Sequence, residues 1–233
     1  MMVGKAVEDI DLQMPHDVYP QNKDGPTFKA YLVIIVRNEK GDIVKIHKQW
    51  SHSPTSNFIG LMLPLNWYIN NNSNWTIKNT LGSSGGYSPV LSSSASCIFY
   101  PGSSGNCPVY LSMIQVGNGQ QSNPYNSYSL AAPIANGSGT GQLLYGAPSV
   151  SQTPTTSGSS VYFIISQTFN NQSGGTVSIT ELGIILNINL WNKSSSSCQN
   201  FGSYLVWYDV LSSPISVSNG GSITIYYTFT VNP

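Results

Sequence analysis

Six long runs rich in valine, isoleucine, threonine, tyrosine and phenylalanine constrain this chain more than any other feature of its sequence. They occupy residues 27–38, 43–50, 161–169, 176–191, 203–211 and 222–231. β-Branched and aromatic residues favour strands, and none of the runs has the spacing of apolar residues that a helix needs. Glycine-containing turns at 39–42 and 219–221 separate neighbouring runs, as in antiparallel hairpins. The sequence therefore predicts an all-β protein.

The segments between the runs are long and rich in Ser, Gly and Asn, and no stretch has the pattern of a helical crossover. Antiparallel strands without crossovers pack face to face, as a β-sandwich or jelly roll. We predict a single jelly-roll domain over residues 27–233 and an N-terminal arm over residues 1–26 outside it. The core should include four residues of the C-terminal runs: Ile184, Leu186, Leu205 and Ile225.

The arm is polar, contains three prolines and has no hydrophobic period. Its acids outnumber its bases and give it a net charge of −3: Glu8, Asp9, Asp11, Asp17 and Asp24 against Lys5 and Lys23. Such a segment either stays disordered or orders on a partner with a basic surface. It lacks the apolar core of a secretory signal peptide. We therefore expect a protein that assembles inside the cell and leaves it as part of a particle.

Charge is scarce in the whole chain, at 8% of residues, with nine basic and nine acidic residues and a formal net charge of zero. An average soluble protein has about 25%. Phosphate neutralisation needs clustered Lys and Arg, so nucleic-acid binding is not expected. No apolar stretch reaches the roughly 18 residues of a membrane span, so no transmembrane segment is predicted either. A surface of Ser, Thr, Asn, Gln and Tyr favours association with neighbouring subunits.

Residues suited to catalysis are few. Glu181 and Asp209 are the only acids after residue 42, and we expect them to bind loop backbone rather than flank a glycosidic bond. The three histidines, His16, His47 and His52, have no metal-site spacing, and nucleophile-elbow, phosphate-loop and dinucleotide motifs are absent from the sequence. We predict neither an enzyme nor a cofactor.

The three cysteines allow at most one intrachain disulfide, and Cys97 with Cys107 brackets a Pro-Gly turn that would suit one. Free buried thiols are the equal alternative. Five N-x-S/T sequons are candidate glycosylation sites: Asn71, Asn74, Asn136, Asn171 and Asn192.

Aromatic residues of one Asn-rich stretch are candidates for a surface role, as a sugar-stacking platform or as subunit-interface anchors: Trp67, Tyr68 and Trp75. Core packing remains an alternative for the aromatic residues in general.

Three motifs carry a resemblance to a known family: R-N-x-x-G-x-I-V at 37–44, T-E-L-G-I at 180–184, and D-V-L-S-S-P-I-x-V-x-x-G-x-S-I-T-I-x-Y-T at 209–228. With their flanking runs they resemble the vertex and turret proteins of turreted icosahedral viruses that infect hyperthermophilic archaea. The resemblance covers both ends of the chain, roughly half of it, and not the Ser/Gly-rich middle.

This resemblance implies a jelly roll, five-fold assembly at a capsid vertex as penton base or turret, and no catalysis or cofactor. It also implies a homopentamer, other capsid or turret proteins as partners, and a place in the virion after assembly in the host cytoplasm. The alternative is a secreted or surface carbohydrate-binding β-sandwich module, and a glycoside hydrolase comes third.

Overall fold

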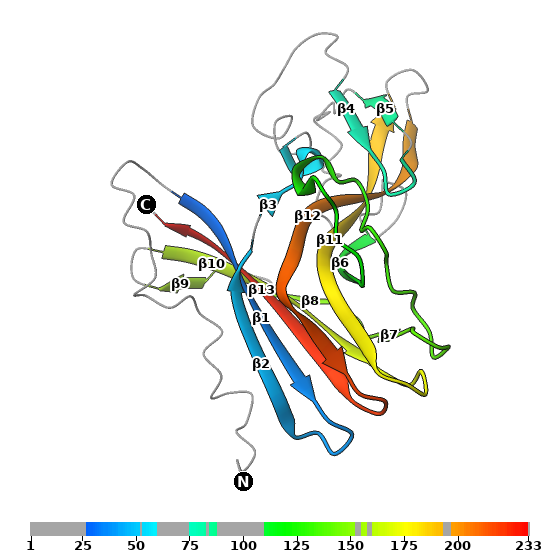
Figure 1. Cartoon of the computed structure of the whole chain (residues 1–233). Helices are drawn as coiled ribbons and strands as arrows, with labels where there is room; N and C mark the ends of the chain where they lie inside the picture. The colour runs from blue at the N-terminus through cyan, green and yellow to red at the C-terminus, as the bar shows by residue number, and fades with distance from the viewer. Residues whose placement is uncertain are drawn as a thin grey trace. The chain divides into compact units, whose positions relative to one another are not determined.

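A computed structural model describes residues 27–51, 53–59, 75–82, 84–87, 110–151, 155–157, 160–192 and 197–232 (Figure 1). The predicted arm at 1–26 lies outside these ranges. The chain divides into two compact units, the first made of Met1–His52, Ile134–Ile179 and Leu211–Pro233, the second of Ser53–Pro133 and Thr180–Val210. The single jelly-roll domain that we predict over residues 27–233 stays a prediction.

The first sheet belongs to the first unit and is antiparallel. Its main strands follow the order β2 (Ile43–Trp50), β1 (Thr27–Arg37), β13 (Ser222–Asn232), β10 (Ser160–Asn170) and β7 (Leu144–Tyr145). Two further short strands, β8 (Ser149–Val150) and β9 (Thr155–Ser157), also pair with β10. The predicted hairpin of β1 and β2 is confirmed, with Gly41 at φ 84°, a left-handed conformation that costs glycine little.

Both faces of this sheet hold buried apolar side chains, because alternate residues of a strand point to opposite faces. Leu32, Ile34 and Val36 are buried on one face. Gln49 and Lys45 pair directly with two of these residues, and so share their face; they contact the backbone of β12 (Ser197–Val217) within the first unit. Within the first unit, this inner face is therefore the one that meets the end of β12 at residues 212–214. Tyr31, Val33 and Ile35 form a cluster on the other, outer face, with Ile43, Trp50 and Tyr226 packed against it.

The second sheet is also antiparallel, with the order β3 (Ser53–Pro54), β12, β11 (Val177–Asn192) and β6 (Tyr110–Gly117). A separate two-stranded sheet joins β4 (Trp75–Lys78) and β5 (Ser84–Tyr87). Helical structure in the described residues amounts to a single turn at 56–59 and the 3₁₀ turn η3 (Pro124–Asn126). The prediction of an all-β chain with antiparallel sheets is confirmed.

Three of the four predicted core residues, Ile184, Leu205 and Ile225, are buried. The prediction was wrong for Leu186, which is only half-buried. Its pairing with β6 is interrupted, since the register shifts between Ile185 and Asn187. A residue at such a bulge leaves the regular ladder, and its side chain leaves the regular in-and-out alternation.

Candidate interaction surface

The second unit is organised around one buried carboxylate, that of Glu181. This residue lies in β11 directly opposite Gly117 of β6 and is fully buried. A β-carbon at Gly117 would overlap the Oε1 atom of Glu181 and would come within 2.8 Å of the carbonyl oxygen of Ala132. The missing side chain at position 117 therefore makes the space that the carboxylate occupies.

Four hydrogen-bond donors point at the two oxygens of Glu181. Oε1 accepts from the backbone N–H of Gly119 at 3.2 Å and of Ala132 at 2.7 Å. Oε2 accepts from the backbone N–H of Ala131 at 3.0 Å and from the hydroxyl of Tyr208 at 2.8 Å. Bonds to a charged acceptor are roughly twice as strong as neutral ones. The expectation that Glu181 binds loop backbone is confirmed.

These bonds fix both ends of the loop at residues 118–133. Thr180 adds a bond from its hydroxyl to the carbonyl oxygen of Gly119 at 2.7 Å. Tyr208 extends the network, because its hydroxyl also accepts from the N–H of Gln121 at 2.7 Å. Burial, assisted by the bond to Glu181, raises the pKa of the Tyr208 hydroxyl well above its usual value, so the hydroxyl stays a donor even at alkaline pH.

The interior of the loop holds itself in place as well. Gln121 donates from its side chain to the carbonyl oxygen of Ser129 at 3.1 Å, and the hydroxyl of Ser127 donates to the backbone carbonyl oxygen of Asn123 at 2.8 Å. The loop is thus bonded at both ends and across its middle, which limits the conformational entropy that a partner would have to remove on binding.

Exposed aromatic and apolar side chains gather on and beside this loop. Tyr125 is 62% exposed and Tyr128 37%. The turn that follows β4 lies against Tyr128: its Leu81 is 88% exposed, and a β-carbon on Gly82 would lie 3.3 Å from the Tyr128 ring. The ammonium group of Lys78 sits 5.2 Å from the centre of the same ring. We call Lys78, Leu81, Tyr125 and Tyr128 the tyrosine patch.

A side chain from elsewhere in the second unit positions the Lys78 end of the patch. The amide nitrogen of Asn57 donates to the carbonyl oxygen of Lys78 at 2.8 Å, and its oxygen accepts from the N–H of Lys78 at 3.0 Å. Asn57 is itself buried. Exposed tyrosines and an aliphatic side chain on a fixed backbone can bury apolar area against another surface while the tyrosines keep a polar tip in water.

Sequence reasoning missed these residues and named others. Its surface candidates Trp67 and Tyr68 lie outside the described residues, and Trp75 is the first residue of β4, paired with Tyr87. The signal that was available is the alternation of turn formers with tyrosine at 124–128, where two tyrosines stand in a segment too polar to be a buried strand.

The remaining predicted site residues are two cysteines and five sequon asparagines, and four of the seven lie outside the described residues. Cys97, Cys107, Asn71 and Asn74 lie outside the described residues. Asn192 is the last residue of β11.

The other two sequons contrast sharply. Asn136 is exposed, and its side-chain oxygen accepts from the N–H of Tyr145 at 3.0 Å. Asn171 is fully buried, and its amide nitrogen donates to the carbonyl oxygens of Gly175 at 2.8 Å and Val217 at 2.7 Å. In the folded chain this amide is committed to the turn after β10, so a glycan there does not fit the structure.

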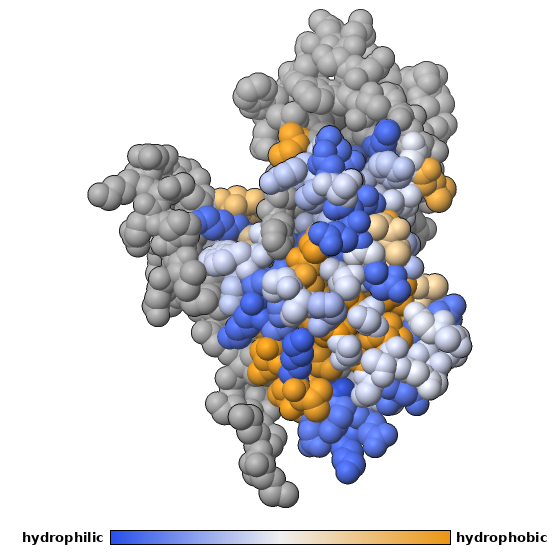
Figure 2. Space-filling model, in the orientation of Figure 1, coloured by the Kyte–Doolittle hydropathy of each residue, from blue (hydrophilic) through white to orange (hydrophobic). Residues whose placement is uncertain are grey.

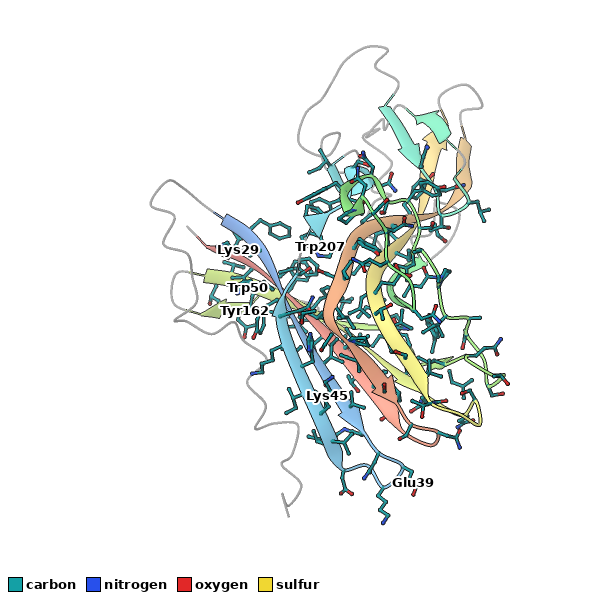
Figure 3. All side chains as sticks on the ribbon, viewed as in Figure 1. Lys29, Glu39, Lys45, Trp50, Tyr162 and Trp207 are labelled. Atoms are coloured by element: carbon teal, nitrogen blue, oxygen red, sulfur yellow. The ribbon has the colours of Figure 1, made fainter. Side chains whose placement is uncertain are left out.

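The outer face of the first sheet carries a second cluster, made of aromatic and basic residues. Lys29 and Trp50 lie close together on this face (Figure 3), with the ammonium group 5.8 Å from the centre of the indole ring. Tyr31 meets the same indole edge-on, with ring centres 5.3 Å apart. Burial raises the pKa of Tyr226 on this face, while the nearby charge of Arg37 opposes the rise. Lys29 and Arg37 thus lie near aromatic rings of this face, so the face is amphipathic rather than purely apolar.

Side chains that could hold a metal ion are dispersed among the described residues. No group of three or more His, Cys, Asp or Glu side chains comes together among them. Glu181 and Asp209 are both fully buried, and Glu181 already accepts four bonds. In the part of the chain that the structure describes, no helix is long and apolar enough to cross a membrane.

Comparison with known family models, with curated proteins and with solved structures finds no match to this chain.

Proposed function

We propose that this protein is a structural subunit of a virus capsid, placed at the vertex as penton base or turret, and that it works as a ring of identical copies, most simply a pentamer. The tyrosine patch carries the proposal. A buried carboxylate with four donors holds exposed tyrosines in place, and such preorganisation favours a permanent contact over a transient one.

The strand order supports the jelly-roll part of the proposal. The first and last long strands of the described chain, β1 and β13, are neighbours along eleven residue pairs. The chain also passes between the two sheets through short connections, from β10 to β11 at residues 171–176 and from β12 to β13 at residues 218–221. A chain that crosses between two antiparallel sheets through short connections is a property of jelly rolls.

The distribution of charge supports association. Beyond the β1–β2 hairpin, the described residues hold only Lys78, Glu181 and Asp209 as charged side chains, and both acids are buried. A surface with so little charge has weak electrostatic repulsion between copies.

The test is the mass of the native assembly, measured by native mass spectrometry for the full chain and for Tyr125→Ser and Tyr128→Ser variants. We expect rings of five copies for the full chain and smaller species for either variant. Tyr162→Ser, a half-buried tyrosine of the first unit, serves as the control and should leave the ring intact. A monomer at high concentration would overturn the proposal.

A carbohydrate-binding module is the second candidate, because exposed tyrosines can also stack on sugar rings. Glycan-array binding by the isolated monomer, lost in Tyr125→Ser and kept in Tyr162→Ser, would favour it. The buried carboxyls of Glu181 and Asp209 give the third reading, a glycoside hydrolase, no support.

A further inference from the structure

The β1–β2 hairpin concentrates the positive charge of the described chain. Its five basic residues outnumber its two acids and give it a net charge of +3: Lys29, Arg37, Lys40, Lys45 and Lys48 against Glu39 and Asp42. The arm at 1–26 has a net charge of −3. The two segments are opposite in sign and equal in magnitude, in a chain that is otherwise almost uncharged.

The hairpin also ends in an exposed apolar edge. β2 is the terminal strand of its sheet in the described part of the chain. Val44, at the bulge that shifts its register, is 60% exposed, and Ile46 is 45% exposed. Figure 2 shows hydrophobic residues at the surface around this hairpin, bordered by hydrophilic ones. Lysines on an edge strand discourage pairing with strands of other proteins. A strand that carries acids can still pair with this edge, because its acids offset the charge of the lysines.

Residues 7–14 of the arm, VEDIDLQM, have the matching pattern. In an extended strand Ile10, Leu12 and Met14 point to one side, and Asp9 and Asp11 to the other. β2 alternates in the same way, with Ile46 on its outer face and Lys45 on its inner face. A strand added beside β2 can therefore place its apolar residues next to Ile46 and its acids next to Lys45. The segment contains no proline, which would block the backbone bonds of such pairing.

We propose that residues 7–14 of a neighbouring copy add as a strand to the β2 edge of the hairpin, so that arms are exchanged around the ring. The inference rests on the proposed ring. The linker is long enough to reach a neighbour. Twelve residues, 15–26, would span up to about 37 Å at 3.1 Å per residue if they were extended, and they include Pro15, Pro20 and Pro26. The eight residues of β2 span about 26 Å, so this reach exceeds the length of the strand that the segment would join.

The experiment uses full-length chains in two isotopic forms, ¹⁴N and ¹⁵N, assembled together, with a photo-reactive amino acid in place of Leu12. Cross-linked peptides are identified by mass. We expect the probe to label residues 43–50, and about half of the cross-linked pairs to combine the two isotopes, as random mixing between copies requires. Pairs of a single isotope only would show that each arm binds its own hairpin and would overturn the exchange.

Charge reversal tests the chemistry of the contact. Lys45→Glu, or Asp9→Lys with Asp11→Lys, should lower the cross-link yield by about tenfold, and the three changes together should restore it. Lys40→Glu, an exposed lysine in the hairpin turn and outside β2, is the control and should leave the yield nearly unchanged. A cross-link yield that stays the same in the charge-reversed variants would overturn the charge pairing. The native mass separates the two proposals: an intact ring without mixed cross-links overturns only the arm exchange, whereas a monomer overturns the ring itself.

Discussion

Replacement of Glu181 by glutamine should loosen the loop that presents the tyrosine patch, although the side chain keeps its size and shape. The best placement of the amide keeps its oxygen at Oε1, where it still accepts from Gly119 and Ala132. The NH₂ group then faces the N–H of Ala131 and the hydroxyl of Tyr208. The hydroxyl can rotate to accept, but the N–H of Ala131 is left facing another donor.

The magnitude follows from these four contacts. Hydrogen bonds to a charged group contribute about 1.5–3 kcal/mol each, and an orphaned buried donor costs about 1–3 kcal/mol. Loss of the buried charge offsets part of this, because the desolvation penalty of the carboxylate disappears. We therefore expect the free energy of unfolding to fall by about 2–4 kcal/mol, a large part of the 5–15 kcal/mol typical of a domain.

Urea denaturation measures the total loss in the free energy of unfolding, and hydrogen exchange shows which parts of the chain lose protection. Exchange at the amides of Gly119, Ala131 and Ala132 should accelerate most, since their acceptor is the group that changed. Glu39→Gln, an exposed acid in the hairpin turn, is the matched control and should change stability by less than about 0.5 kcal/mol. A loss below that value in Glu181→Gln, or unchanged exchange at Ala131, would refute the reasoning.

Three further predictions follow from the same geometry. Gly117→Ala should lower the free energy of unfolding by about 1–3 kcal/mol, through overpacking against Glu181, and so lower the melting temperature; Gly175→Ala, with open space around it, should change both little. Asn171→Ala removes two hydrogen bonds to backbone carbonyls and should cost about 2–4 kcal/mol in urea titration; an unchanged midpoint would contradict its anchoring role. The raised pKa of Tyr208 means that the unfolded chain loses this proton above about pH 10 while the folded chain keeps it. Stability should then decline by about 1.4 kcal/mol per pH unit above pH 10, and Tyr208→Phe should flatten that slope.

Local pattern was enough to predict the strands and their turns. The β1–β2 hairpin follows from β-branched residues on both sides of a glycine turn, and Gly41 adopts the left-handed conformation that such a turn needs. The last turn follows in the same way from Asn219, Gly220 and Gly221, with Gly220 at φ 79°. These are contacts between near neighbours in sequence, so short segments contain all the information.

The role of Glu181 was predictable in kind but not in detail. Two carboxyls alone in apolar runs must find hydrogen bonds, because an unpaired buried charge is too costly. Which donors they find depends on contacts across 27 to 62 residues, to Tyr208 and to Gly119 at the two extremes. No pattern of residue types encodes that pairing.

Asn171 and Tyr125 show what only the tertiary structure decided. The first belongs to a sequon in a polar loop and reads as a surface site, yet its amide is buried because Val217, 46 residues away, supplies an acceptor. The second reads as one tyrosine among fourteen, yet it is exposed because the loop around it is bonded at both ends to Glu181. The sequence by itself determined the strand content, the scarcity of charge and the acidic arm, since these depend on composition and local order. Burial and exposure of single polar and aromatic side chains depend on which distant segments meet, and that was decided by packing.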